Sequence, residues 1–256
     1  MARPGHSEFA AGGLFWDWIA KGLVGAGLAQ PDGDAYFRFD LAKLLQALLG
    51  NKSCADVGVP NLFGHPRLLS TDPNRSNSGF MFAGLAANLL IGEVATVDTL
   101  GKVAEPVETL FARMGYKPSS SGKMFEDYLA GGPGAQPLVV GYENQLIEWV
   151  LEDEARWKRL EAAAPAKPVI LYPRPTVFSA HPLIVVKDAA GPLVDALMSP
   201  DIQTIAWTRH GFRAPLGLSG ETDNPLVANR IMPRVDAVLP MPGIKTMLVL
   251  IGRIAG

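Results

Sequence analysis

The pattern of apolar and polar positions along the chain predicts helices that alternate with short strands. Apolar residues at helical spacing, or nearly continuous apolar runs, predict helices over residues 7–27, 40–50, 79–92, 97–115, 119–132, 144–164 and 243–256. Residues 190–212 are predicted to form two helices that meet near Ser199 and Pro200. Short apolar runs bounded by prolines or polar loops predict strands over residues 67–71, 137–143, 168–173 and 182–187. The region before residue 66 is interpreted as two helices and loops without a clear strand.

The two N-terminal helices are predicted from different features. In residues 7–27 the apolar residues fall roughly on one helical side, namely Phe9, Phe15, Trp16, Ile19 and Leu23. In residues 40–50 Asp40 is the expected N-cap, and Gly50 is expected to end the helix.

The predicted strands are apolar along most of their length. Such strands, when they alternate with helices, are typical of a mostly parallel sheet that helices cover on both faces. The sequence therefore predicts the α/β class.

Composition excludes several classes of protein. The chain has 256 residues, of which 48% are hydrophobic and 19% charged, so it is long and apolar enough for a folded core. Its formal net charge is −2 and it has no arginine-rich run, which argues against a nucleic-acid partner. The most apolar segment, residues 247–255, is too short to insert across a membrane.

Cysteine and histidine usage predicts no metal site and no cofactor. The one cysteine, Cys54, excludes an internal disulfide and a cysteine-only metal site. The four histidines are His6, His65, His181 and His210, and they lack the short spacings of metal ligands. The N-terminus has no apolar segment typical of a secretion signal.

The stretch LLSTDPNRSNSG, residues 68–79, is the strongest candidate for a binding site. A predicted strand ends there in a polar loop, which opens the next helix, and α/β folds bind ligands at such positions. The first amides of a helix lack partners within the helix and suit an anion. Ser76, Asn77 and Ser78 add hydrogen-bond donors, and Gly79 permits close approach. The alternative is that Ser76 or Ser78 only caps the helix.

Tyr142 is a second candidate, because it follows PLVVG at the carboxyl end of the predicted strand 137–143. Its hydroxyl would donate a hydrogen bond to a bound oxygen. Ordinary packing of the ring is an equally weighted interpretation.

A serine hydrolase is the alternative enzyme hypothesis. Ser120 and Lys123 have the S-x-x-K spacing of serine–lysine nucleophiles, although the accompanying S-D-N and K-T-G elements are absent. A serine cap on a helix beginning near Gly122 explains the same letters and is favoured. No catalytic residue is therefore predicted, and the chain is expected not to be an enzyme.

Five segments taken together resemble the bacterial extracellular solute-binding proteins with the type II periplasmic-binding-protein fold, close to the molybdate- and sulfate-binding receptors. They are STDPNRSNSGFMFAGLAANLL, SSSGKMFEDYLAGG, PLVVGYENQLIEWV, VILYPRPTVFSAHPLIVV and SPDIQTIAWTRHGFR. The resemblance covers roughly residues 66–215. It implies two α/β lobes, with residues 1–68 plus 173–256 as the discontinuous first lobe and residues 69–172 as the second.

The resemblance also implies a function and its site. The chain would capture a small anionic solute, an oxyanion or a carboxylate, and deliver it to a membrane transporter by hinge closure. The implied donors are Ser76, Asn77 and Ser78, with Asp72 shaping the turn and Tyr142 closing the far side. Arg75 would add a bidentate contact to a carboxylate. The implied location is extracellular or periplasmic, although the missing signal leaves the cytoplasm open.

The chain departs from the family pattern before residue 66, where the usual strand–helix–strand unit is not evident. The first lobe is therefore expected to be incomplete, and the chain could be an orphan domain without the transport role. A third hypothesis is a protein-interaction domain that uses Phe15, Trp16 and Trp18 as an exposed surface, although core burial is the commoner fate of such residues.

Overall fold

The computed structural model describes residues 8–33, 35–162, 167–181, 183–213, 224–228 and 230–255, with side chains in the first strand described from Gly12 onward. The strands are β1 (Glu8–Trp16), β2 (Ala29–Pro31), β3 (Tyr36–Phe39), β4 (Leu68–Leu69), β5 (Leu138–Tyr142), β6 (Pro168–Pro173) and β7 (Phe178–Ala180). The helices are α1 (Asp17–Gly25), α2 (Leu41–Leu49), α3 (Asn77–Ile91), α4 (Val97–Leu100), α5 (Ala104–Arg113), α6 (Ser121–Ala135), α7 (Glu143–Glu152), α8 (Glu154–Ala162), α9 (Gly191–Leu197), α10 (Pro200–His210) and α11 (Ile244–Ala255), with the short 3-10 helices η1 (Ala55–Val57) and η2 (Asp188–Ala190).

One sheet organises the described residues. Its strand order is β2-β3-β6-β1-β5-β4, and β7 pairs with the outer end of β1. β3, β6, β5 and β4 point in one direction, whereas β1 lies antiparallel between β6 and β5. The α/β class predicted from the sequence is confirmed, with the central strand β1 and the edge strand β2 antiparallel to their neighbours.

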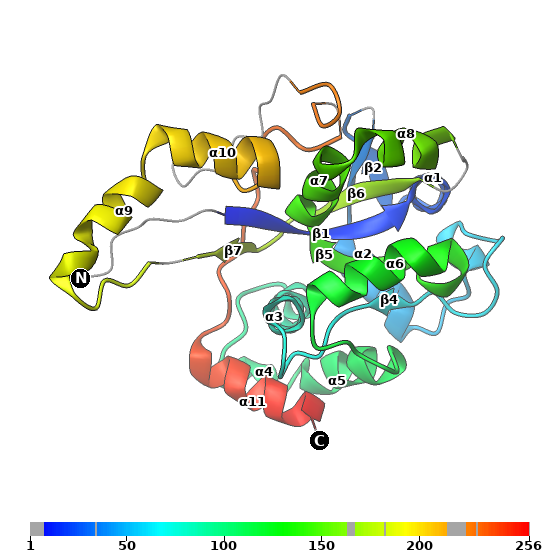
Figure 1. The fold of residues 1–256 in the computed structure, drawn as a ribbon. Coiled ribbons are helices and arrows are strands. Elements are labelled where there is room, and N and C mark those ends of the chain that lie inside the picture. The colour runs from blue at the N-terminus through cyan, green and yellow to red at the C-terminus, as the bar shows by residue number, and fades with distance from the viewer. Residues whose placement is uncertain are drawn as a thin grey trace.

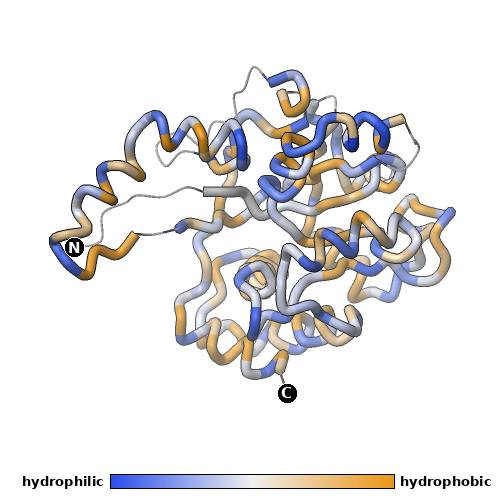
Figure 2. The backbone as a smooth tube through the Cα atoms, in the orientation of Figure 1, coloured by the Kyte–Doolittle hydropathy of each residue, from blue (hydrophilic) through white to orange (hydrophobic). Residues whose placement is uncertain are grey.

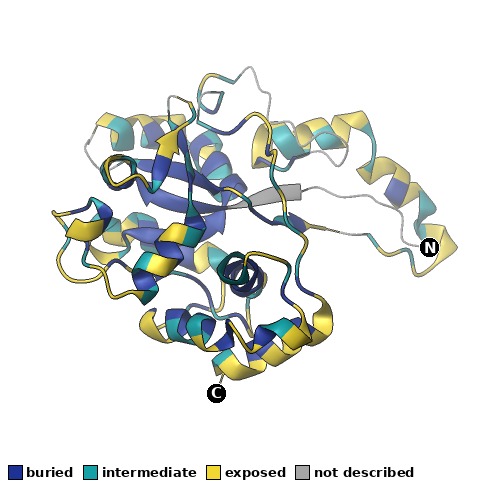
Figure 3. Ribbon diagram, turned by 180° about the vertical axis from the view of Figure 1, so that it is seen from behind, coloured by how far each residue is buried: buried dark blue, intermediate teal, exposed yellow. Residues whose placement is uncertain are grey.

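Helices cover both faces of this sheet (Figure 1). α7, α8 and α10 lie over one face, and α3 and α6 lie over the other, where α4, α5 and α11 form an outer layer. Figure 2 shows the hydrophobic segments concentrated in the sheet and its adjacent helices, while the outer helix α8 is largely hydrophilic. The central strands β5 and β6 are accordingly buried along their whole length (Figure 3), whereas the edge strand β2 is mostly exposed.

The prediction of one helix over residues 7–27 is wrong in its first half. Residues 8–16 form the central strand, and only Asp17 begins a helix. Leu14, Phe15 and Trp16 are at most 2% exposed, because consecutive side chains of a central strand point into the layers on opposite faces.

The aromatic side chains of β1 belong to the core. The indole of Trp16 stacks on the ring of Tyr128 at 4.6 Å between centroids, and its Nε1 donates to the Gln136 carbonyl at 3.0 Å. Phe15 is fully buried, and Trp18 is partly buried against the same cluster. The hypothesis that these residues form an exposed interaction surface is therefore wrong.

The expectation that no strand precedes residue 66 is also wrong. β1, α1 and the β2–β3 hairpin form a strand–helix–strand unit within the first 39 residues. β3 then pairs with β6 in parallel, which joins this unit to the rest of the sheet. Short strands of three and four residues carry too little periodicity to be distinguished from loops by pattern alone.

The predicted strand over residues 182–187 is replaced by the earlier strand β7, which pairs with Glu8–Ala10 of β1. Residues 184–187 form no strand, and Ile184 and Val186 are 69% and 85% exposed. A run of β-branched residues needs a neighbouring strand with free backbone groups before it can extend a sheet.

The sequence-derived lobe boundaries cross the sheet. One boundary falls between the two residues of β4, and the other falls within β6. Strands on both sides of these boundaries pair directly, as β1 does with β5. Among the described residues, the two predicted lobes, residues 1–68 plus 173–256 and residues 69–172, therefore contribute strands to one sheet.

Most helices agree with the sequence. Asp40 caps α2, accepting the amide of Lys43 at 3.0 Å, and Gly50 follows its last residue. The predicted helix over residues 144–164 is two helices, α7 and α8, because Asp153 is extended between them. Ser199 caps α10 where the sequence predicts two helices to meet.

Candidate functional site

The carboxyl ends of β3, β4, β5 and β6 share one edge of the sheet. α2 and α7 begin directly after β3 and β5, and α3 begins eight residues after Leu69, so three helix N-termini follow strands at this edge. Each brings backbone amides without partners within the helix. This is the edge at which open α/β sheets bind ligands.

The loop before α3 is a tight turn built around Asp72. Its carboxylate Oδ1 accepts the amide of Asn74 at 2.8 Å, and its carbonyl accepts the amide of Ser76 at 2.9 Å. Its own amide donates to the Pro118 carbonyl at 2.9 Å. Asp72 therefore shapes the turn through its own loop, and its carboxylate is engaged there.

Gly79 lets the first turn of α3 lie against this loop. A Cβ atom at residue 79 would lie 2.3 Å from the Thr71 carbonyl oxygen and 2.9 Å from the Pro73 nitrogen. Both atoms belong to the backbone and cannot rotate away. Glycine is thus required by the close approach that the sequence indicated.

Three hydroxyl groups form a chain at the N-terminus of α3. The Oγ atoms of Ser76 and Ser78 lie 3.0 Å apart, and the Ser78 Oγ lies 2.7 Å from the Thr71 Oγ1. Ser76 occupies the N-cap position, yet its side chain makes no capping hydrogen bond. Its hydroxyl is therefore directed to Ser78 instead of to the helix amides, unlike that of an ordinary cap.

Asn77 connects this turn to two distant segments. Its Nδ2 donates to the Tyr142 Oη at 3.3 Å and to the Ser179 Oγ at 3.1 Å. Tyr142 ends β5, and Ser179 lies in β7, so residues 65 and 102 positions away meet at one side chain. We call Thr71, Ser76, Asn77, Ser78, Tyr142 and Ser179 the polar cluster.

Tyr142 remains a neutral phenol at this place. Burial raises its pKa, although hydrogen bonds with Asn77, Ser179 and Ser78 act in the opposite direction. The side chain is only 7% exposed, so both packing and hydrogen bonding determine its position. The phenol can therefore serve as a hydrogen-bond donor at neutral pH.

The polar cluster is open on one side and closed on the other. Asn77 is exposed and Ser76 half-buried, whereas Thr71 and Ser78 are buried. Below the cluster, Ser78 and Tyr142 line a cavity of about 20 Å³ bounded by Gly12 and Gly13 of β1. That volume suits about one water molecule, so a solute would contact the cluster from its exposed side.

The structure therefore brings four of the six predicted site residues into direct contact: Ser76, Asn77, Ser78 and Tyr142. Asp72 lies in the adjoining turn, and Arg75 is exposed there without a hydrogen bond or ion pair from its side chain to any residue in the described ranges. Thr71 and Ser179 were missed. Thr71 lies within the polar stretch itself, but nothing in the local sequence relates Ser179 to it.

Glu143, next to Tyr142, is part of a buried ion pair. Its carboxylate receives two hydrogen bonds from Arg213, at 2.6 Å and 2.7 Å, and one from the Tyr172 hydroxyl at 2.7 Å. Glu143 and Arg213 are both fully buried. Burial disfavours the charged guanidinium, but the Glu143 carboxylate outweighs it and raises the pKa of Arg213.

The ion pair also connects residues 232–233 to the sheet. Arg213 also donates to the carbonyls of Met232 and Pro233 at 2.7 Å and 3.2 Å. Burial, and next the Glu143 carboxylate, raise the pKa of the Tyr172 hydroxyl well above its ordinary value. Glu143 is therefore occupied by protein groups and is not directed toward a solute.

Ser120 and Lys123 are not arranged for nucleophilic catalysis. The Ser120 Oγ accepts the amide of Lys123 at 3.4 Å, which is the predicted helix cap. The Lys123 ammonium forms an exposed ion pair with Asp127, and the hydrogen bond to that carboxylate raises the lysine pKa. A lysine base needs the opposite shift, so this geometry favours the cap.

The described residues contain neither a metal cluster nor a membrane-spanning helix. Within those ranges, no three histidine, cysteine, aspartate or glutamate side chains gather in a way that would hold a metal ion; His6 lies outside them. No helix in the described part of the chain has the length and apolar character needed to cross a bilayer.

No protein-family model matches the chain, and no curated protein matches it by sequence. Solved structures do. The substrate-binding protein of an ABC transporter from Agrobacterium tumefaciens matches with a TM-score of 0.54 and 17% identity over 98% of this chain and 64% of its own. A two-component-system protein that mediates signal transduction matches with a TM-score of 0.51 and 14% identity over 96% and 68% of the two chains.

A periplasmic binding protein also matches, with a TM-score of 0.49 and 15% identity over 97% of this chain and 66% of its own. The chain thus spans about two thirds of the length of each of these structures. At such low identity the likeness concerns the fold. The chain has an α/β fold similar to that of the substrate-binding protein from Agrobacterium tumefaciens.

Proposed function

We propose that this chain is a solute-binding protein that captures a small oxyanion or carboxylate at the polar cluster. One observation carries the proposal. Asn77, at the N-terminus of α3, meets Tyr142 and Ser179 at the carboxyl edge of the sheet, where three segments distant in sequence converge. The fold shared with a substrate-binding protein supports the same function.

The donors at this place suit an anion without a full counter-charge. The first amides of α3 carry partial positive charge, and the Ser76 hydroxyl and Asn77 amide lie on the exposed side of the cluster. The Asp72 carboxylate accepts a hydrogen bond from the Asn74 amide, so its negative charge is held within the loop and not directed at the solute. Arg75 would add a bidentate contact if the solute is a carboxylate.

Ser179 connects the site to a means of delivery. It lies in the ribbon that β7 forms with Glu8–Ala10 at the outer end of β1. A movement of this ribbon would make or break the contact between Ser179 and Asn77. Solute capture would thus be coupled to hinge closure. The closed, solute-loaded protein would then dock on a membrane transporter from the extracellular or periplasmic side.

Thermal unfolding of the purified chain tests the proposal. The panel is molybdate, tungstate, sulfate, phosphate, acetate and succinate. A solute at a hundred times its dissociation constant stabilises the native state by about 2.7 kcal/mol, which raises the unfolding temperature by a few degrees. We expect one of the anions to do so.

The matched variants are Asn77→Ala and Asn74→Ala. Asn74 lies in the same loop and is exposed, but its side chain makes no hydrogen bond within the described part of the structure. Asn77→Ala should abolish the ligand-induced shift, whereas Asn74→Ala should preserve it. A shift that survives Asn77→Ala, or no shift with any anion, would contradict binding at the polar cluster.

A further inference from the structure

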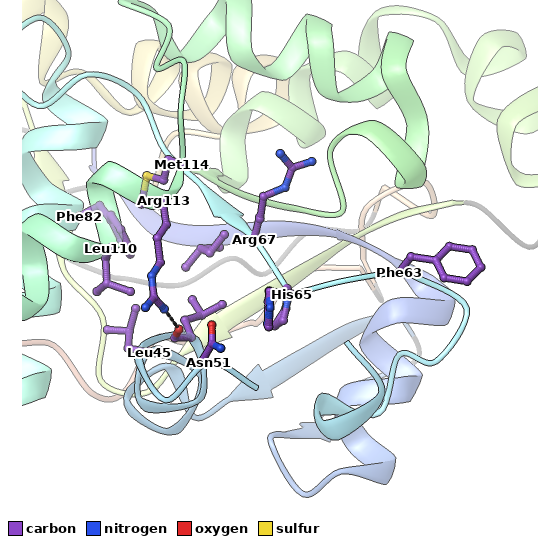
Figure 4. A pocket seen from close by; sticks show the side chains of 12 residues that line it. Leu45, Asn51, Phe63, His65, Arg67, Phe82, Leu110, Arg113 and Met114 are labelled. Atoms are coloured by element: carbon purple, nitrogen blue, oxygen red, sulfur yellow. Dashed lines mark hydrogen bonds between the residues drawn. The ribbon is translucent and has the colours of Figure 1, made fainter. Parts of the chain in front are cut away.

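A separate pocket lies between α2, α5 and the loop before β4. Its volume is about 430 Å³, within the range of small-molecule sites. Figure 4 shows the side chains that line it, contributed by α2, the loop of residues 51–67, α3 and α5. None of its lining residues belongs to the polar cluster, so it is a site of its own.

The wall of this pocket is apolar. It is formed by Leu45, Leu48, Leu68, Phe82, Leu110 and Met114. All six are at most 9% exposed, so they are fixed by the core behind them. A dry cavity of about 150 Å³ with similar walls holds a benzene ring, so this larger pocket admits a ring with a side chain.

The polar side chains at the pocket are those of Asn51, His65, Arg67 and Arg113. Arg67, Arg113 and His65 line it, and no aspartate or glutamate is among the described lining residues. The guanidinium of Arg113 donates one hydrogen bond to the Leu48 carbonyl at the end of α2, which fixes its position and leaves other donors available. Arg67 is exposed, and its side chain has no hydrogen bond or ion pair to any residue in the described ranges.

We propose that this pocket binds a small amphipathic carboxylate, an acid with an aromatic or short alkyl body. The body would fill the apolar wall, and the carboxylate would pair with the guanidinium of Arg113, toward which the exposed side chain of Arg67 would turn from the position drawn in Figure 4. Two arginines in the lining of one pocket, of which only Arg113 is anchored, supply charge complementarity for an anion, and the leucine-rich wall excludes a fully hydrated inorganic ion. The site would therefore select ligands that differ from the solute proposed for the polar cluster.

Titration with 4-phenylbutyrate tests this site, with 4-phenyl-1-butanol as the uncharged match. The methyl signals of methionines labelled with carbon-13 report the location. Met114 lines the pocket, whereas Met81 lies beside Asn77 in the polar cluster. We expect the acid to shift the Met114 signal and not the Met81 signal, and to bind at least tenfold more tightly than the alcohol.

Arg67→Gln should weaken binding of 4-phenylbutyrate about tenfold, which corresponds to about 1.4 kcal/mol. Arg234→Gln is the matched control, because Arg234 is exposed, lies outside the pocket and loses the same charge. Equal affinities for acid and alcohol, an effect of Arg234→Gln as large as that of Arg67→Gln, or a shift at Met81 instead of Met114 would each overturn the proposal. The Met81 result would place the acid in the polar cluster and leave the first proposal standing.

Discussion

At the scale of single residues, the position of the α3 N-terminus depends on a glycine, because a side chain at residue 79 would overlap the preceding loop. Gly79 brings the helix against the Thr71 carbonyl, and this contact places the Ser78 hydroxyl 2.7 Å from the Thr71 hydroxyl. The sequence indicated Gly79, Ser76 and Ser78 because they are neighbours in one polar stretch. It did not indicate Ser179, whose contact with Asn77 spans 102 residues.

Gly79→Ala should destabilise the fold by about 1–3 kcal/mol, because the new methyl group would overlap backbone atoms that cannot move aside. Gly122→Ala is the control. Gly122 also lies in the first turn of a 15-residue helix, but a methyl group added there would lie 3.6 Å from its nearest neighbour, the Ser120 Oγ. Urea unfolding of both variants checks this, and equal stabilities would show that the close approach at Gly79 is not required.

At the scale of elements, the sequence pattern alone identified helices that are buried on one face and helices that are buried through most of their length. α11 is amphipathic and packs on α3, α4 and α5, and α3 is buried through most of its length. β1 was mistaken for a helix because its apolar residues, taken together with Ile19 and Leu23 of α1, fall roughly on one side of a helix, and they equally fit a strand buried on both faces. Its pairing with β5 and β6 decides between the two.

Within α11, Leu250→Ala should lower the free energy of unfolding by about 2–5 kcal/mol, because Leu250 is fully buried. Leu248→Ala in the same helix should change it by less than about 0.5 kcal/mol, because Leu248 is 63% exposed. Chemical unfolding of the two variants measures the difference. A comparable loss in both would mean that the exposed face of α11 is covered in solution.

At the scale of the whole molecule, the buried ion pair joins segments that lie far apart in sequence. Glu143 begins α7, Tyr172 lies in β6, and Arg213 follows α10 and reaches the carbonyls of Met232 and Pro233. A buried pair is not by itself strongly stabilising, but removing one partner leaves an uncompensated charge.

Arg213→Met should therefore destabilise the chain by about 3–5 kcal/mol, and the double variant Glu143→Met with Arg213→Met should recover part of that loss. Arg230→Met is the comparison. Arg230 forms an equally short pair with Glu161, at 2.6 Å, but both side chains are more than 20% exposed, so about 1 kcal/mol is expected. Urea unfolding of the three variants measures these losses. If the double variant is no more stable than Arg213→Met, the uncompensated charge is not the cause.

The sequence by itself determined the α/β class, most helices, the capping residue Asp40, and the polar stretch before α3. These features depend on local periodicity and on side chains within one turn of each other. Tertiary structure decided the central position of β1, the strand–helix–strand unit before residue 66, the contact of Asn77 with Tyr142 and Ser179, and the burial of Glu143 against Arg213. Each of these depends on backbone pairing or side-chain contact between distant segments, which a local pattern cannot encode.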